Sequence, residues 1–318
     1  MIYDIIMGSM TVDDSIKYVL EGRKTFFIVP DVSLLPEVFL EDYMNRGYEA
    51  YIINDDKYCP LRTKVDIIIN TFADSILFFY VNAVVEGIEW RRYILELQRK
   101  YGESVLIGVL HAPCETDAER IEMERFYAFD VGVKCGCITL EYNKNKNYPL
   151  IDRVLYATQA CGRRKSVRAI CDSASRVTFT ISDKSLLKEN AYFEKNMMYK
   201  GKVLDVSISH FSCMFDRVLG LKIGAKIPSV LVNINGMHFT SDAMLLMQRE
   251  NPGGTLFIFG FLNKDGKKGL DPDNEARLLE KIYLIVSDKV KALMSEKFDE
   301  ARQNALANRN RHVASNEN

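Results

Sequence analysis

The first half of the chain alternates between short apolar runs and amphipathic segments, and this alternation limits the fold more than any other feature of the sequence. Five short runs are typical of strands, at 25–31, 50–54, 76–82, 105–111 and 135–140. Each precedes a segment with helical spacing of apolar residues, at 35–47, 61–72, 88–102, 116–127 and 149–160. Strands that alternate with helices predict a parallel sheet covered by helices on both faces.

The carboxyl ends of the strands are where such a sheet carries binding and catalytic groups. The residues expected there are Asp31, Asn54, Asn82, His111 and Glu141. No G-x-G-x-x-G or Walker-type glycine loop follows any strand, so the sheet lacks a nucleotide-binding fingerprint. We expect Asp31 and His111 to be caps or turn residues rather than catalytic groups.

The order and length of these segments, over about residues 24–160, resemble the receiver domain of response regulators. The resemblance implies an acidic pair after the first strand, an aspartate nucleophile after the third and a hydroxyl after the fourth. This chain has only Asp31 after the first strand, Asn82 at the nucleophile position and His111 in place of the hydroxyl. Because an amide is not a competent phosphoryl acceptor, we expect a pseudo-receiver that serves docking or dimerisation.

The composition changes after residue 160. Closely spaced runs rich in β-branched and aromatic residues follow one another at 176–181, 199–208, 227–239 and 254–262. Strands without intervening helices predict an antiparallel barrel or sandwich. A helix is expected over 271–294, and its apolar stripe should pack on the barrel through Leu278, Ile282, Ile285 and Val286.

Two motifs frame this second half. The run GRRKSVRA at 162–169 contains Arg163 and an R-x-x-x-R pattern formed by Arg164 and Arg168. The later run DVSISH contains Asp205 and Ser207 at D-x-S spacing. Together they resemble the PilZ domain, whose signature is R-x-x-x-R before the first strand and (D/N)-x-S-x-x-G later. The likeness covers about residues 160–298.

PilZ domains commonly bind cyclic di-GMP, and the residue chemistry suits that ligand. Arg164 and Arg168 could pair with phosphate oxygens or guanine edges, or stack on a purine. Asp205 can accept hydrogen bonds from a guanine, and Ser207 can donate one to a phosphate or a base. Arg163 also fits, because many members of the family read RRxxxR.

His210 stands where the PilZ pattern has its glycine. A glycine at such a position usually means a positive φ or a backbone pressed against a ligand. The imidazole could weaken binding, change how many ligands fit, lie aside or gain a contact of its own. The resemblance therefore implies ligand-binding roles for Arg163, Arg164, Arg168, Asp205, Ser207 and His210.

The chain as a whole is an ordinary globular protein with a net charge of −1, so any anion site must be a local cluster. Its longest apolar runs fall well short of the roughly 20 residues that span a bilayer. The N-terminus lacks the basic region of a signal peptide, and the seven cysteines form no C-x-x-C pattern. We expect a cytoplasmic protein with reduced thiols that binds no DNA or RNA and does not insert into a membrane.

The sequence predicts two domains, α/β plus β. A receiver-like α/β domain is expected over 1–157, a PilZ-type β-barrel with a closing helix over 158–298, and a polar, partly disordered tail, helical only at its start, over 299–318. The leading hypothesis is a non-catalytic cyclic di-GMP receptor, without cofactor or metal, that changes its domain arrangement to regulate a protein partner. The alternative is a degenerate PilZ module that binds no nucleotide and acts through protein interactions.

Overall fold

The computed structural model describes residues 22–56, 59–72, 74–161, 166–187, 197–215, 219–251 and 254–316. Contacts between residues divide the chain into two compact units, and each is described by itself. The α/β unit holds the sheet of the first half of the chain, and the barrel unit holds Ser166–Asp288. The domain boundaries expected from the sequence, at 157/158 and 298/299, remain predictions.

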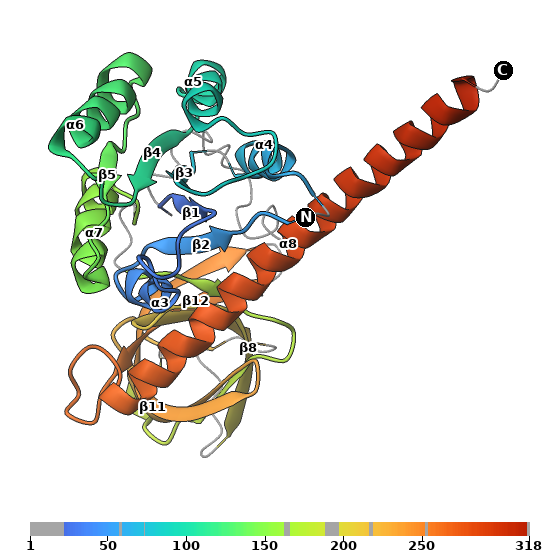
Figure 1. Cartoon of the computed structure of the whole chain (residues 1–318). Helices are drawn as coiled ribbons and strands as arrows, with labels where there is room; N and C mark the ends of the chain where they lie inside the picture. The colour runs from blue at the N-terminus through green and yellow to red at the C-terminus, as the bar shows by residue number, and fades with distance from the viewer. Residues whose placement is uncertain are drawn as a thin grey trace. The chain divides into compact units, whose positions relative to one another are not determined.

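The α/β unit is built on one parallel sheet (Figure 1), as the alternating pattern predicted. Its strands are β1 (Lys24–Ile28), β2 (Glu49–Ile53), β3 (Ile76–Tyr80), β4 (Leu106–His111) and β5 (Cys137–Thr139). All neighbours are parallel and their order is β2-β1-β3-β4-β5, one of the two common doubly wound orders. Phe26, Phe27, Phe78 and Phe79 are all fully buried, so β1 and β3 are covered on both faces.

Helices follow each strand of this sheet. They are α3 (Val38–Asn45), α4 (Leu61–Thr71), α5 (Trp90–Tyr101), α6 (Asp117–Arg125) and α7 (Asn147–Ala157). A π-helix, η1 (Phe126–Val131), continues α6 beyond its predicted end, and a short 3-10 turn, η2 (Lys144–Lys146), precedes α7. The likeness of this unit to receiver domains stays a prediction.

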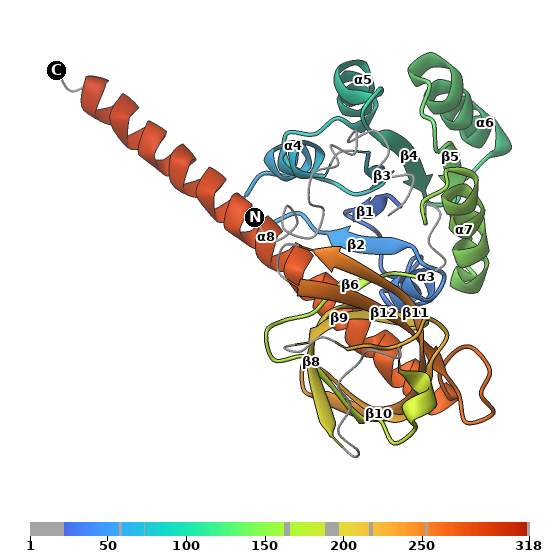
Figure 2. The same ribbon diagram turned by 180° about the vertical axis from the view of Figure 1, so that it is seen from behind.

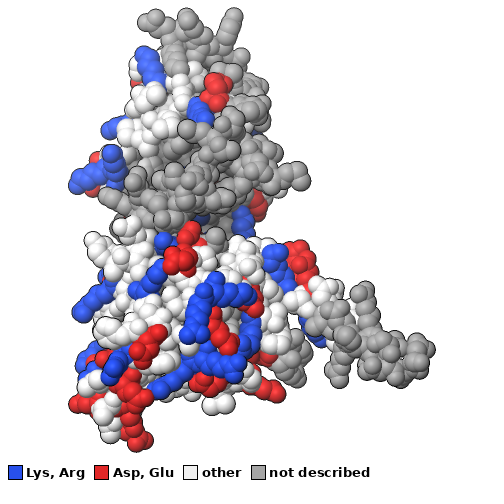
Figure 3. Space-filling view, turned by 90° about the horizontal axis from the view of Figure 1, so that it is seen from above, with Lys and Arg blue, Asp and Glu red and all other residues white. Residues whose placement is uncertain are grey.

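The helix surfaces of the α/β unit carry charges of both signs. Glu96 of α5 pairs with Arg62 of α4 (3.3 Å) and Arg92 of α5 (2.8 Å). Arg91 of α5 reaches Glu122 of α6 at 3.1 Å. Figure 3 likewise shows a face of the molecule on which Lys and Arg lie among Asp and Glu. The Arg62–Glu96 and Arg91–Glu122 ion pairs link neighbouring helices.

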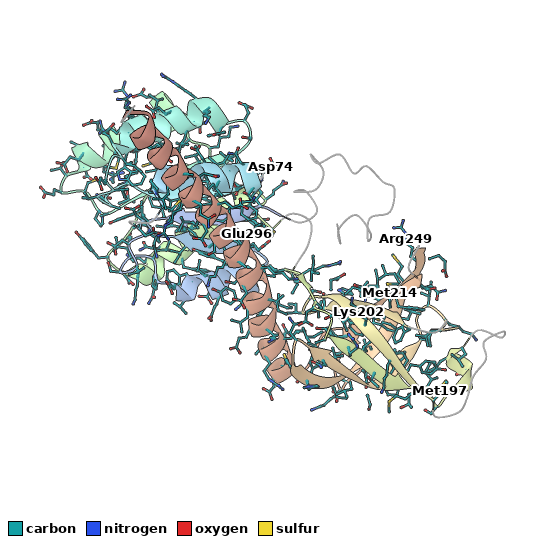
Figure 4. The ribbon with its side chains drawn as sticks, turned by 90° about the vertical axis from the view of Figure 1, so that its right-hand side faces the viewer. Asp74, Met197, Lys202, Met214, Arg249 and Glu296 are labelled. Atoms are coloured by element: carbon teal, nitrogen blue, oxygen red, sulfur yellow. The ribbon has the colours of Figure 1, made fainter. Side chains whose placement is uncertain are left out.

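The barrel unit is an antiparallel barrel (Figure 2), as the composition predicted. Its strands are β6 (Ala169–Ile170), β7 (Arg176–Thr180), β8 (Met198–Val206), β9 (His210–Phe215), β10 (Lys226–Ile234), β11 (Met237–Asn251) and β12 (Gly254–Leu262), and a 3-10 turn, η3 (Lys184–Leu186), follows β7. The sheet order is β6-β8-β7-β10-β11-β12-β9, and pairing of β8 with β9 closes it. Lys202 of β8 and Met214 of β9, labelled in Figure 4, are register partners on this closing seam.

The strand predicted over 227–239 is wrong as a single element. Asn235 and Gly236 have φ of 47° and 88°, and they form the tight turn that joins β10 to β11. Asn-Gly is the residue pair that two-residue hairpin turns favour, because both of its φ angles can be positive. The pattern also missed β9 and the long β11.

The helix α8 (Pro272–Asn316) covers part of the barrel with its first turns, and residues 272–288 belong to the barrel unit. All four residues of the predicted apolar stripe are buried, with exposed fractions of 0–8%: Leu278, Ile282, Ile285 and Val286. Asn274 and Arg277 donate to the carbonyls of Thr240 and His238, both at 3.4 Å. The prediction that this helix packs on the barrel is confirmed.

The predicted end of this helix at Met294 is wrong, because α8 continues to Asn316. The residues after Met294 contain neither Gly nor Pro and are mostly good helix formers. Val290 and Met294 also belong to the hydrophobic core of the α/β unit, and Phe298 packs against that core. These three apolar contacts lie before the polar segment predicted over 299–318.

Candidate functional site

The β8–β9 hairpin carries the D-x-S motif, and a turn at 207–209 joins its strands. Ser207 is 1% exposed. Its hydroxyl oxygen accepts hydrogen bonds from the backbone N–H groups of His210 (3.2 Å) and Ser209 (3.4 Å). The Ser207 N–H donates to the His210 carbonyl at 2.8 Å. Ser207 therefore stabilises the turn. Serine is common in tight turns because its hydroxyl can hydrogen-bond to nearby backbone groups.

Arg168 reaches this hairpin through β6, a two-residue strand that pairs antiparallel with β8. Ile170 of β6 is the register partner of Asp205, so Arg168 lies level with the turn. The Arg168 Nη1 atom is 3.8 Å from Asp205 Oδ1, a distance longer than a hydrogen bond. The fold thus brings together two residues that are far apart in the chain.

The ion pair between Arg168 and Asp205 is accessible to solvent. The arginine side chain is 40% exposed and the carboxylate 27%. Ion pairs with such exposure contribute about 0–1 kcal/mol to the stability of the fold. A ligand could therefore displace this ion pair at little cost in free energy. Arg163 and Arg164 lie outside the residues that the structure describes, and their roles stay predictions.

The second oxygen of Asp205 accepts a hydrogen bond from the hydroxyl of Ser212. Ser212 is 4% exposed and is the register partner of Asp205 across the hairpin. The carboxylate is thereby oriented, with one oxygen bound to Ser212 and the other near Arg168. The sequence interpretation missed Ser212, although counting outward from a turn at 207–210 places it opposite Asp205.

His210 opens β9 at the position of the family's glycine. Its φ is not among the positive values of the structure, so this backbone position does not require glycine. The ring Nδ1 lies 2.6 Å from the hydroxyl of Ser209. Burial lowers the pKa of His210, and the charges of Arg168 and Lys268 lower it further. The charges of Arg168 and Lys268 therefore both act on His210, and the sequence interpretation missed Lys268.

Polar side chains at the strand ends of the α/β unit form hydrogen bonds within and between the adjoining loops. Asp31 accepts hydrogen bonds from the N–H (2.9 Å) and hydroxyl (2.6 Å) of Ser33, and these bonds lower its pKa. Asn82 Oδ1 accepts from the N–H of Ala112 at 2.8 Å. The contacts of Asp31 agree with the expectation that it is a turn residue.

His111 at the end of β4 is completely buried. Its Nδ1 lies 2.8 Å from the carbonyl of Ala112, and its Nε2 lies 3.0 Å from the hydroxyl of Thr139 on β5. Because the carbonyl can only accept, Nδ1 donates to it; burial lowers the pKa of His111 and so favours the neutral ring, in which Nε2 accepts from Thr139. The imidazole thus links the ends of two strands as a neutral ring.

No cluster of three or more His, Cys, Asp or Glu side chains in the described ranges could hold a metal ion. Among the helices of the same ranges, none combines the length and the apolar character of a membrane span.

Comparison with known proteins finds similarity only at the level of solved structures. No family model and no curated protein matches the sequence. The PilZ domain of YcgR from Escherichia coli with c-di-GMP is 16% identical, with a TM-score of 0.31, over 41% of this chain and 97% of that chain. The E. coli YcgR complex with c-di-GMP is 18% identical, with a TM-score of 0.32, over 42% of this chain and 50% of that chain.

A third similar structure is the K. pneumonia MrkH–c-di-GMP complex, at 15% identity and a TM-score of 0.30, over 41% of this chain and 53% of that chain. The match thus spans about half the length of YcgR and of MrkH. At such identities and TM-scores the likeness says nothing about the ligand of this chain. The chain is similar to solved PilZ domains, as its two motifs predicted.

Proposed function

We propose that this chain is a non-catalytic receptor for cyclic di-GMP, which binds beside the β8–β9 turn of the barrel unit. The proposal rests mainly on the distance of 3.8 Å between Arg168 Nη1 and Asp205 Oδ1. The register of β6 with β8 brings these two residues close together. The proposed contacts are Arg168, Asp205 and His210, with Arg163 and Arg164 from the adjoining run. Ser207, whose hydroxyl is used by the turn, acts chiefly by positioning its neighbours.

The chemistry of the pair matches the two ends of a guanine nucleotide. A guanidinium forms charge-assisted hydrogen bonds to phosphate oxygens or to the O6 and N7 acceptors of guanine. A carboxylate accepts from the N1–H and exocyclic amine of guanine, which adenine does not present in that arrangement. Since Ser212 already orients Asp205, the carboxylate is prepared to select guanine.

We further propose that the ligand orders the segment around residues 161–168 and changes the arrangement of the two units, which regulates a protein partner. Ordering of a segment by new charge pairs is a common way to transmit binding. Limited proteolysis near Arg164, with and without ligand, tests this step. Unchanged cleavage at saturating ligand would contradict it.

A second candidate function is a PilZ-type interaction module that binds no nucleotide. His210 favours it, because an imidazole occupies the space that the family pattern leaves to glycine. Competition of unlabelled nucleotides against a fluorescent cyclic di-GMP separates the two functions. The receptor predicts displacement by cyclic di-GMP but not by GTP or cyclic di-AMP at equal concentration. Absence of any saturable binding of the probe would favour the interaction module.

A further inference from the structure

The loop between β12 and α8, at 263–271, lies beside the turn that carries Ser209 and His210. The N–H of Phe261 donates to the carbonyl of Ser209 at 3.0 Å, and the carbonyl of Phe261 accepts from the N–H of Gly269 at 3.0 Å. The backbone of one residue is therefore bonded to the turn and to the loop. This places Lys268, which precedes Gly269, beside the hairpin.

The position of Lys268 is held by the backbone. Lys268 forms an isolated antiparallel bridge with Leu262 of β12. The preceding residues fold into a compact turn around Asn263, whose side-chain oxygen accepts from the N–H groups of Lys267 (2.9 Å) and Asp265 (3.1 Å). A loop ordered in this way loses little freedom when a ligand binds, which favours affinity.

The charges near Lys268 leave room for an anion. Its side chain is exposed, and no carboxylate of the described residues lies within ion-pair distance of its ammonium group. The acid at the end of the loop, Asp271, pairs instead with Lys264 at 3.7 Å. Of the described residues, Arg168 and Lys268 are the cations whose charges lower the pKa of His210, and Asp205 is the carboxylate paired with Arg168. Such an excess of positive groups favours a negatively charged ligand.

We propose that Lys268 is a further ligand-binding residue, whose ammonium group contacts a phosphate of the dinucleotide held by Arg168 and Asp205. The inference deepens the proposed function and rests on it. Lysine supplies a compact point charge with rotatable donors, so it would add attraction to the phosphate without fixing the orientation of the ligand. Arg168 and Asp205 would provide that orientation.

The neighbouring Lys267 provides a matched control. Lys267→Ala and Lys268→Ala each remove one positive charge from the same loop. Of these two lysines, Lys268 is the one whose charge lowers the pKa of His210. We expect Lys268→Ala to bind cyclic di-GMP roughly five- to twenty-fold more weakly at low salt, from loss of one charge-assisted contact. Lys267→Ala should bind like the unmodified chain, and Lys268→Arg should recover most of the affinity.

The salt dependence gives a second readout. Because salt screens exposed charges, the difference between Lys268→Ala and the unmodified chain should shrink as the ionic strength rises. Thermal unfolding of both alanine variants checks that the fold is retained. Equal affinity of the two variants, with strong binding by the unmodified chain, would overturn the role of Lys268 and leave the receptor function standing. Absence of binding by the unmodified chain would overturn both.

Discussion

The Nη1 atom of Arg168 lies 3.8 Å from Oδ1 of Asp205, and Ser212 holds the other oxygen of that carboxylate. The pair is partly exposed and lacks a direct hydrogen bond between its members. A cation and an oriented acceptor are therefore both available at the same edge of the barrel.

Asp205→Asn should narrow the preference for cyclic di-GMP over cyclic di-AMP. The amide keeps the shape of the carboxylate but replaces one acceptor oxygen by an NH2 donor. That donor cannot accept a hydrogen bond from the N1–H or the amine of guanine, which are donors themselves. It also frees Arg168 for phosphate, so affinity for both dinucleotides becomes more similar. Competition binding measures the ratio, with Asp273→Asn on the exposed start of α8 as the control. A preference as strong as that of the unmodified chain would show that Asp205 does not select the base.

Ser207→Ala should destabilise the barrel as well as weaken ligand binding. The buried hydroxyl accepts from two backbone N–H groups, and its removal leaves them without that partner. We expect the free energy of unfolding to fall by about 1–3 kcal/mol. Denaturant unfolding compares this variant with Ser173→Ala, whose serine is exposed. A loss of binding without a loss of stability would instead indicate that the Ser207 hydroxyl contacts the ligand.

Binding of the dinucleotide should tighten as the pH falls from about 7.5 towards 6. In the free protein, burial and the charges of Arg168 and Lys268 keep the pKa of His210 below its ordinary value of 6.5. A bound phosphate offsets those charges and raises the pKa, so the complex takes up a proton. Titrations at several pH values should show this trend in the unmodified chain and in His238→Asn, an exposed histidine of β11. The same pH dependence in His210→Asn would exclude His210 as its source.

Stability of the α/β unit should decrease as the pH falls below about 6.5. Burial lowers the pKa of His111 from its ordinary value of 6.5. The unfolded chain therefore binds a proton before the folded protein does, and this contribution favours unfolding below the unfolded pKa and vanishes above it. Denaturant unfolding between pH 5 and pH 7.5 measures the slope, which His111→Asn should reduce. An unchanged slope in that variant would assign the effect to other groups.

The sequence predicted the architecture well because periodicity reports burial. The apolar run of β3 and the stripe that starts at Leu278 are both buried as expected. The prediction from sequence failed where the local pattern and the tertiary contacts favour different structures. Asn235-Gly236 lies inside a predicted strand, although its turn chemistry is strong, and the tail predicted to be helical only at its start continues α8 to Asn316.

The candidate site could be predicted only in part. Arg168, Asp205 and His210 follow from the motifs, and Ser212 could have been found by counting outward from the turn. Lys268 could not, because it lies far along the chain and reaches the turn through backbone bonds made by Phe261. Such long-range register depends on the closure of the whole barrel and is not visible in a local pattern.

The most direct measurement is calorimetric titration of cyclic di-GMP into the whole chain, its Arg168→Ala variant and Arg249→Ala. Arg249, labelled in Figure 4, lies on β11 opposite Leu256, at the other end of β12 from His210. The account predicts saturable binding by the unmodified chain and Arg249→Ala, and roughly ten- to hundred-fold weaker binding by Arg168→Ala, from loss of charge-assisted hydrogen bonds. No heat from the unmodified chain at tens of micromolar ligand, or equal affinity of the two arginine variants, would contradict it.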